Sequence, residues 1–386
     1  MGTIEQYSTT TGRRYRVRYR TPDRKQTDKR GFRTKRDAEL FLATIEVTKA
    51  TGEYIEPNRA RTTIRELGNG WLEAKRSRLK LSSYRALEDA WRVYVDPRWG
   101  ATPVSTIRYS DVRTWVSELS AGTAKTNRRD HIRTRGQVAR PKSATVVIRA
   151  HGVLASILDI AVKDRRIPHN PARGVDNLPR KSRKAHQYLT HVEVERLAQA
   201  ADEHSTLVYL AAYTGLRWGE LTALRVRDVD ALRRRLSVNE NAVRVGAEIH
   251  VGSPKTHERR SVPYPEFLEL AIAQLCEGKA RGDILFGDGD EYIQRPRSSG
   301  QSRSWFVTAL DDAGLERMTV HDLRHTAASL AISSGANVKA VQRMLGHASA
   351  AMTLDVYADL FDDDLDTVSA SLNDARNSAV NAAGDD

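Results

Sequence analysis

The sequence has a single cysteine and no long uninterrupted stretch of apolar residues. Cys276 is alone among 386 residues, so it cannot form an internal disulfide, and thiolate metal clusters are excluded. A membrane-spanning helix needs roughly 18 consecutive apolar residues, and the N-terminus lacks the apolar core of a secretory signal. We therefore expect a protein of a reducing compartment, the cytosol.

Acidic charge is also scarce, but only in the first half of the chain. The 62 Lys and Arg residues outnumber the 49 Asp and Glu residues, which gives a net charge of +13. Residues 1–60 carry +6, residues 61–180 carry +13, and residues 181–386 carry −6. A basic surface of this kind attracts polyphosphate and releases counterions on binding. Nucleic acid is therefore favoured as the partner over an anionic membrane surface.

The length and the periodicity predict a mainly α protein with small β elements, in three domains. Single cores rarely grow past roughly 250 residues, so several domains are expected. Segments 57–62 and 178–187 have the composition of linkers. The division that we predict is a small sheet plus helix at 1–60, a helical domain at 63–177, a mixed α/β domain at 187–372, and a disordered acidic tail at 373–386.

Residues 13–20 alternate strictly between two faces, which predicts a strand. Its apolar face holds Tyr15, Val17 and Tyr19, and its basic face holds Arg14, Arg16, Arg18 and Arg20. A second strand near 27–32 and a helix capped by Thr34 are expected to follow. Positions 13–36 contain 12 basic and 2 acidic residues, so we expect this module to bind DNA, with a merely solvated strand as the alternative.

The middle of the chain contains two sequence patterns that are typical of the N-terminal ends of helices. Thr63 and Glu66 have the spacing of a capping box, and Ser110 is expected to cap another helix. Residues 125–142 are rich in Arg and Lys, with Asp130 as their one acid, so this span is predicted to face phosphate. The expected DNA contacts there are Arg128, Arg129, Arg133 and Arg135.

Four short segments of the third domain hold the polar residues that could carry chemistry. They are TGLRWGEL at 214–221, SPKT at 253–256, HDLRHT at 321–326, and LGH at 345–347 with a tyrosine ten residues later. Arginine forks bind phosphate oxygens bidentately and can stabilise the charge of a pentacoordinate transition state. A tyrosine hydroxyl, with an ordinary pKa of about 10, needs nearby cations or a base before it attacks. The set suits a metal-free reaction at a phosphodiester.

In this order the four segments resemble the tyrosine recombinases, specifically phage-type integrases with an added N-terminal arm-binding domain. The resemblance implies that Arg217 and Arg324 bind the scissile phosphate and that Lys255 protonates the departing 5′ oxygen. It further implies that Tyr357 is the nucleophile.

The remaining polar positions of these segments receive supporting roles from the same resemblance. His321 becomes a candidate proton acceptor for the tyrosine, and His347 a hydrogen-bond donor to the phosphate. Glu220 is interpreted as an acceptor that orients a catalytic side chain, whereas His325 is expected to be structural.

The implied activity is site-specific DNA strand exchange through a 3′-phosphotyrosine and a four-way junction. The ester conserves the phosphodiester energy, so no metal and no other cofactor is expected. The implied partners are double-stranded DNA with core and arm attachment sites, a homotetramer on DNA, a host architectural protein and an excision factor. The implied location is the cytoplasm of a bacterial host.

Three other functions compete with this interpretation. His321 and His325 also form an H-D-x-x-H pattern, close to the H-E-x-x-H helix of zinc peptidases. A type IB topoisomerase would share the tyrosine chemistry. A basic transcription regulator would explain the charge distribution, but it would gain nothing from Tyr357.

Overall fold

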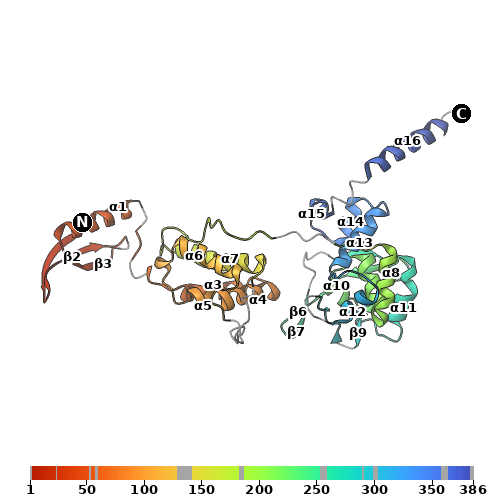
Figure 1. Cartoon of the computed structure of the whole chain (residues 1–386), viewed down its shortest axis with the longest axis horizontal. Helices are drawn as coiled ribbons and strands as arrows, with labels where there is room; N and C mark the ends of the chain where they lie inside the picture. The colour runs from red at the N-terminus through yellow and green to blue at the C-terminus, as the bar shows by residue number, and fades with distance from the viewer. Residues whose placement is uncertain are drawn as a thin grey trace. The chain divides into compact units, whose positions relative to one another are not determined.

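The computed structural model describes residues 2–22, 24–51, 54–56, 60–127, 141–181, 187–252, 259–288, 291–298, 303–357 and 364–382. The chain divides into two units, Met1–Arg183 and Lys184–Asp386. Helices make up most of the regular structure, with short antiparallel sheets beside them (Figure 1). The expected mainly α protein with small β elements is confirmed.

A three-stranded antiparallel sheet and one helix form the N-terminal module. Its elements are β1 Thr3–Thr9, β2 Gly12–Arg20, β3 Gln26–Phe32 and α1 Lys35–Ala50. Val17 and Tyr19 are buried in a small core shared with α1, so the two-faced strand predicted for β2 is confirmed. The Thr34 side chain accepts a hydrogen bond from the Asp37 backbone N–H at 3.1 Å, which satisfies a free donor of the first turn.

The remainder of this unit is helical and has a separate apolar core. Its elements are α3 Ile64–Arg76, α4 Leu81–Ala90, the π-helical turn Trp91–Val95, α5 Asp96–Trp99, the 3-10 turn Val104–Thr106, α6 Tyr109–Ala121 and α7 Ala144–Lys163. Trp99 and Trp115 meet edge to face in this core, with ring centroids 5.8 Å apart. Both rings are almost fully buried, so they anchor α5 against α6.

Of the two helix caps predicted in the middle of the chain, one is present and one is wrong. The capping box of Thr63 and Glu66 starts α3. The helix that Ser110 was expected to cap instead begins at Tyr109, with Arg108 in the capping position. The cause is the carboxylate of Asp111, which accepts from the Arg108 backbone N–H at 3.1 Å and so fixes the first turn two residues earlier.

In the described part of the chain, one helix, α7, is long and apolar enough to cross a membrane by length and composition, with a mean hydropathy of 1.7. Half of that window is buried inside the protein. Val147, Leu154 and Leu158 are fully covered, and α7 contacts α3, α4 and α6. Packing in the helical core therefore accounts for the apolar character of α7.

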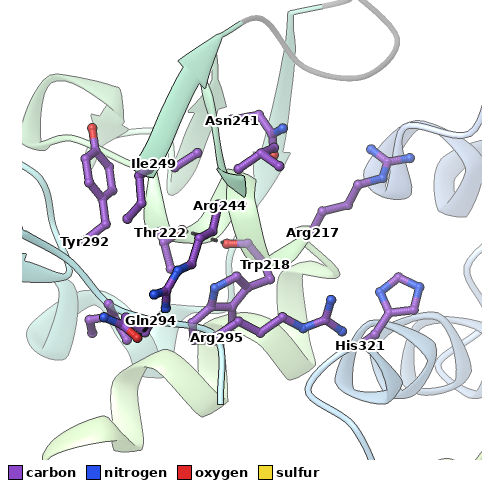
Figure 2. A pocket seen from close by; sticks show the side chains of 14 residues that line it. Arg217, Trp218, Thr222, Asn241, Arg244, Ile249, Tyr292, Gln294, Arg295 and His321 are labelled. Carbon is purple, nitrogen blue, oxygen red and sulfur yellow. Dashed lines mark hydrogen bonds between the residues drawn. The ribbon is translucent and has the colours of Figure 1, made fainter. Parts of the chain in front are cut away.

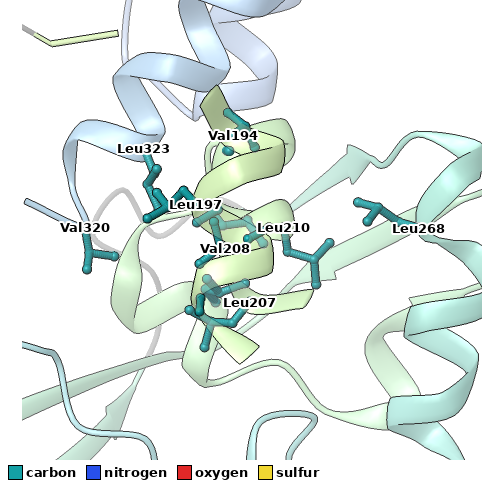
Figure 3. Packing of buried hydrophobic residues seen from close by; sticks show 14 of the residues in the cluster. Val194, Leu197, Leu207, Val208, Leu210, Leu268, Val320 and Leu323 are labelled. Carbon is teal, nitrogen blue, oxygen red and sulfur yellow. The ribbon is translucent and has the colours of Figure 1, made fainter. Parts of the chain in front are cut away.

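The C-terminal unit surrounds a core built by α8 and α9 with α12 and α13. Figure 3 shows Leu197 of α8, Leu210 of α9 and Leu323 of α13 in this core. The helices are α8 His191–Ala200, α9 Ser205–Thr214, α10 Trp218–Thr222, α11 Glu269–Cys276, α12 Trp305–Asp312, α13 Asp322–Ser333, α14 Val338–Leu345, α15 Ala350–Tyr357 and α16 Asp364–Ala382, with 3-10 turns at Asp202–His204, Val226–Asp228 and Glu266–Leu268.

Short strands lie beside these helices. One sheet has the order β4-β5-β8, from Val229–Asp230, Arg235–Val238 and Arg260–Pro263. The hairpins are β6 Asn241–Val245 with β7 Glu248–Gly252, and β9 Gly287–Asp288 with β10 Glu291–Tyr292. Because β8 contacts α14, the sheet reaches the helices that carry the polar motifs.

The C-terminal segment differs from its prediction. Residues 373–382 belong to helix α16, where we expected a disordered tail. Alanine is the strongest helix former, and three alanines in this stretch favour the helix over the disorder that its polar residues suggest. The predicted boundaries at 1–60, 63–177 and 187–372 remain a prediction.

Candidate active site

Helix ends bring three of the four polar segments together. Arg217 is the residue before α10, two positions after the left-handed Gly215 that ends α9 with φ +62°. His321 and Arg324 occupy the first turn region of α13, which packs on α9. His347 follows the left-handed Gly346 at the end of α14, and Tyr357 is the last residue of α15. The fold therefore gathers residues that lie 140 positions apart.

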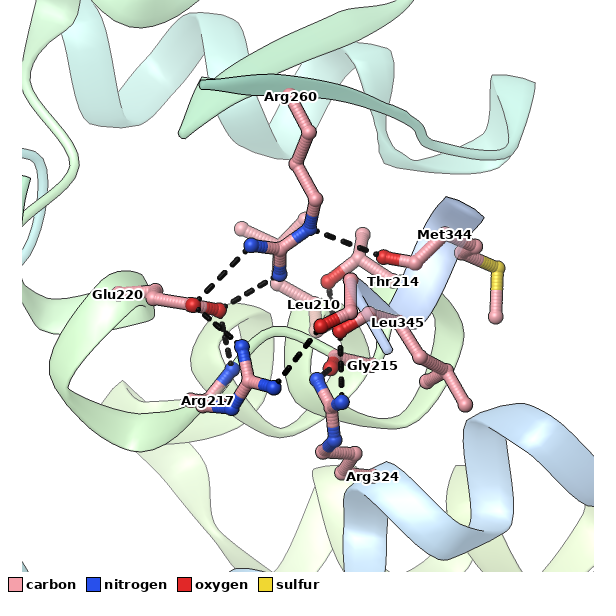
Figure 4. A network of polar contacts seen from close by, with 10 residues as sticks. Leu210, Thr214, Gly215, Arg217, Glu220, Arg260, Arg324, Met344 and Leu345 are labelled. Atoms are coloured by element: carbon pink, nitrogen blue, oxygen red, sulfur yellow. Dashed lines mark hydrogen bonds and ion pairs between the residues drawn. The ribbon is translucent and has the colours of Figure 1, made fainter. Parts of the chain in front are cut away.

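Glu220 is the centre of a buried ion-pair network (Figure 4). Its carboxylate accepts from Arg217 Nη1 at 2.8 Å and from the Arg217 backbone N–H at 3.0 Å. Arg260 of β8 binds the same carboxylate with both terminal nitrogens, at 3.1 and 2.6 Å. Burial alone would raise the pKa of Glu220, but the hydrogen bond and charge of Arg260, together with Arg217, lower it to about 2. Glu220 therefore stays ionised and holds both arginines.

Arg324 is oriented by backbone carbonyls. Its Nη1 donates to the Gly215 oxygen and its Nη2 to the Leu345 oxygen, each at 2.6 Å. Burial, followed by the charges of Arg217 and Arg260, lowers the pKa of Arg324 to about 9. Arg217 and Arg260 form ion pairs with Glu220, and their charges also act on Arg324. The repulsion among the three guanidinium groups favours a bound anion.

His321 and His347 are neutral at physiological pH in this environment. Burial and the positive charge of Arg324 and Arg217 lower the pKa of His347 to about 4. The pKa of His321 is also lowered, by burial and then by Arg324 and Arg295. His347 Nδ1 lies 3.0 Å from the Thr353 hydroxyl, which fixes the orientation of the ring.

Tyr357 is 1% exposed and packs in a small apolar cluster of α13 and α14 residues, with Ala328, Ile332, Val341 and Leu345. Its hydroxyl lies 2.8 Å from His325 Nδ1. The His347 ring is stacked on the tyrosine with centroids 6.4 Å apart. Burial raises the pKa of Tyr357 to about 12, although the charge of Arg324 opposes the shift. The hydroxyl therefore needs an acceptor for its proton before it can attack.

A cavity of about 350 Å³ opens beside this network. Arg217 and His321 line it together with Trp218, Arg244 and Arg295. Figure 2 shows these side chains around the cavity. A phosphate oxygen entering there would meet guanidinium groups on more than one side.

The structure brings Arg217, Glu220, His321, Arg324, His347 and Tyr357 into one site of the C-terminal unit. Lys255 lies outside the described residues, and so do Arg128, Arg129, Arg133 and Arg135. Among the described residues, no group of three or more His, Cys, Asp or Glu side chains could hold a metal ion.

The arginines of the N-terminal strand lie on β2 as predicted, but two of them are paired. Glu5 of β1 is the cross-strand neighbour of Arg16 and forms ion pairs with Arg16 and Arg18. Their charge is therefore partly neutralised. Arg14 is half-buried and Arg20 is exposed on the same strand.

Sequence reasoning missed two residues of the site. Arg260 lies five residues after Lys255 in the sequence, and its pairing with Glu220 depends on the position of β8. His325 was expected to be structural, yet it contacts the tyrosine hydroxyl. Its one-turn spacing from His321 was the available signal, since residues four apart share a helix face.

Residues 187–363 match the Phage integrase family, residues 5–49 match the Arm DNA-binding domain, and residues 63–120 match the phage integrase N-terminal SAM-like domain. The integrase of Mycobacterium phage D29 is 26% identical over 342 residues, covering 84% of each chain. The chain belongs to the phage integrase family of tyrosine recombinases.

Solved structures share this recombinase fold. The Tn1549 transposon integrase in complex with transposon right end DNA matches with a TM-score of 0.60 and 21% identity, over 77% of this chain and 95% of that chain. A lambda integrase tetramer bound to a Holliday junction matches with a TM-score of 0.53 and 17% identity, over 89% of this chain and 96% of that chain. This phage-type integrase is a site-specific tyrosine recombinase, and the zinc peptidase, topoisomerase and regulator alternatives are not favoured.

Proposed function

We propose that this recombinase integrates and excises DNA between attachment sites, cutting one strand at a time through a 3′-phosphotyrosine at Tyr357. The observation that carries this proposal is the group of three guanidinium ions around one carboxylate, next to a buried tyrosine. Such a group has excess positive charge, which favours the binding of a phosphodiester anion.

In the proposed cleavage step, Arg217 and Arg324 bind the scissile phosphate and stabilise its transition state. Glu220 keeps Arg217 in place, and neutral His347 donates a hydrogen bond to a phosphate oxygen. The Tyr357 oxygen bonds to phosphorus while the bond from phosphorus to the 5′ oxygen breaks, and Lys255 protonates that oxygen. The new ester keeps the energy of the phosphodiester, so the strand can be passed to a 5′-hydroxyl of the partner site without metal or ATP.

The proposed working form is a homotetramer on two duplexes, in a closed head-to-tail ring. The matched lambda integrase is a tetramer on a Holliday junction, which supports this assembly. Leu372 of α16 is 67% exposed, as expected of a C-terminal helix that docks on a neighbouring protomer. The N-terminal module would bind arm sites, and a host architectural protein and an excision factor would assist in the bacterial cytoplasm.

Substitution Tyr357→Phe tests the proposed nucleophile. The variant should bind attachment-site DNA as the wild type does but form no detergent-stable protein–DNA adduct, because only the attacking oxygen is removed. Wild-type protein should form the adduct in excess EDTA. An adduct with the phenylalanine variant, or cleavage that returns only when zinc or magnesium is added, would contradict the proposal.

A further inference from the structure

The Tyr357 oxygen lies at hydrogen-bond distance from a histidine to which the family resemblance assigns no catalytic role. His325 Nδ1 lies 2.8 Å from that oxygen, and the two rings are tilted with centroids 5.7 Å apart. The two side chains belong to different helices, since His325 is on α13 and Tyr357 is the last residue of α15. The contact is therefore a product of the fold rather than of sequence proximity.

Burial makes this contact chemically important. A phenol that is 1% exposed cannot release its proton to bulk water, so a side chain at hydrogen-bond distance has to receive it. In a neutral imidazole, one ring nitrogen accepts while the other carries hydrogen. With the proton on Nε2, His325 presents Nδ1 as an acceptor to the tyrosine hydroxyl.

We propose that His325 is the catalytic proton acceptor for Tyr357 in strand cleavage, an assignment that rests on the proposed function. As the tyrosine oxygen bonds to phosphorus, its proton moves to His325 Nδ1, and the departing 5′ oxygen takes a proton from Lys255. In religation the 5′-hydroxyl attacks phosphorus and returns its proton to Lys255. The bond from phosphorus to the Tyr357 oxygen breaks, and protonated His325 returns its proton to that oxygen. No oxidant, reductant or further reactant is needed.

His321 is placed for a different task. It precedes α13 and lines the cavity together with Arg217 and Arg295, where a phosphate would lie. Its ring meets His325 edge to face with centroids 5.1 Å apart, so it supports the position of His325. The role of proton acceptor that the resemblance gives to His321 therefore passes to the histidine one turn later.

The test measures the rate of covalent adduct formation on nicked attachment-site DNA, which traps the product. His325→Ala should slow the rate by about 100-fold, because a positioned general base contributes that much or more. Added imidazole should raise the rate of adduct formation by the His325→Ala variant about tenfold, because free imidazole can accept the proton of the tyrosine. His325→Asn keeps a polar group near the hydroxyl but cannot take up its proton, so it should stay slow.

A second His–Tyr pair in the same unit is a matched control. His191 Nδ1 lies 2.8 Å from the Tyr213 hydroxyl, and neither residue belongs to the site. His191→Ala should cleave at the wild-type rate. The comparison separates loss of a histidine–tyrosine hydrogen bond in general from loss of this particular one.

Replacing Tyr357 with a fluorinated tyrosine distinguishes proton transfer from positioning. A more acidic phenol depends less on a base, so the penalty of His325→Ala should shrink by about tenfold in the fluorinated protein. The proposal is overturned if His325→Ala or His325→Asn cleaves at the wild-type rate. It is also overturned if neither imidazole nor fluorination changes the defect, since that pattern indicates a structural role. Absence of any adduct in the wild type would instead defeat the proposed function.

Discussion

Glu220 is a charged residue with 1% of its side chain exposed, and its place in the protein depends on two arginines. An ionised carboxylate loses several kcal/mol of hydration when it is buried, so it is stable only while its partners supply charge and hydrogen bonds. Arg260 supplies two of these bonds and is itself only 10% exposed. Arg260 is thus a positioning residue that acts on Arg217 through Glu220.

Arg260→Ala should destabilise the C-terminal unit by about 3 kcal/mol, because it leaves the Glu220 charge with less compensation. Hydrogen exchange of the α10 and α14 amides would measure the loss locally. Arg227→Ala is the control, since Arg227 is 47% exposed in its pair with Glu240 and should cost below about 1 kcal/mol. Equal effects of the two substitutions would contradict the account of the network.

At the scale of elements, the end of α14 determines where His347 lies. Gly346 has φ +64°, and its N–H bonds to the Arg343 oxygen, so the chain turns sharply after the helix. A side chain at this position would meet Arg260 Nε at 2.9 Å. Arg260 cannot move aside freely, because Glu220 and the Met344 oxygen hold its guanidinium.

Two glycines of this region form a matched pair for a substitution experiment. Gly335→Ala has open space around it at φ +81° and should cost only the left-handed strain of about 1 kcal/mol. Gly346→Ala adds the clash with Arg260 and should cost at least about 1 kcal/mol more, with slower adduct formation. Urea unfolding and adduct assays would measure both effects, and identical behaviour of the two variants would refute the proposed packing.

The sequence predicted those strands and helix starts that depend on interactions between residues close together in the chain. The alternation of residues 13–20 and the Thr63–Glu66 box are complete in the sequence and reappear in β2 and α3. Strand β1 was not predicted because buried and exposed residues barely alternate along it. It is held in the sheet by its antiparallel pairing with β2. The Glu220–Arg260 pair was missed because it joins residues 40 positions apart, which only tertiary packing brings together.

For the whole molecule, the positive charge is concentrated in residues 1–180. Binding at two separate DNA sites by one chain raises the effective concentration at the second site to the order of millimolar across a short linker. A weak contact of the N-terminal module could therefore decide which DNA is recombined. The ion pairs of Glu5 with Arg16 and Arg18 limit how much charge that module offers.

Replacing Arg14, Arg16, Arg18 and Arg20 with alanine should abolish integration on arm-bearing DNA but leave cleavage of an isolated core site nearly intact. The log–log salt slope of arm binding should become shallower by up to about 4, or roughly one unit per lost phosphate contact. Glu5→Gln is the opposite control, since freeing two arginines should tighten arm binding. Loss of core-site cleavage in the alanine variant would show that the module is misassigned.

The most direct test of the central claim identifies the residue that becomes linked to DNA. Wild-type protein would be trapped on nicked attachment-site DNA in EDTA, digested with protease and nuclease, and analysed by mass spectrometry. The account predicts a nucleotide joined through its 3′ phosphate to the peptide that contains Tyr357. Linkage to another residue, or cut DNA without any covalent protein, would contradict it.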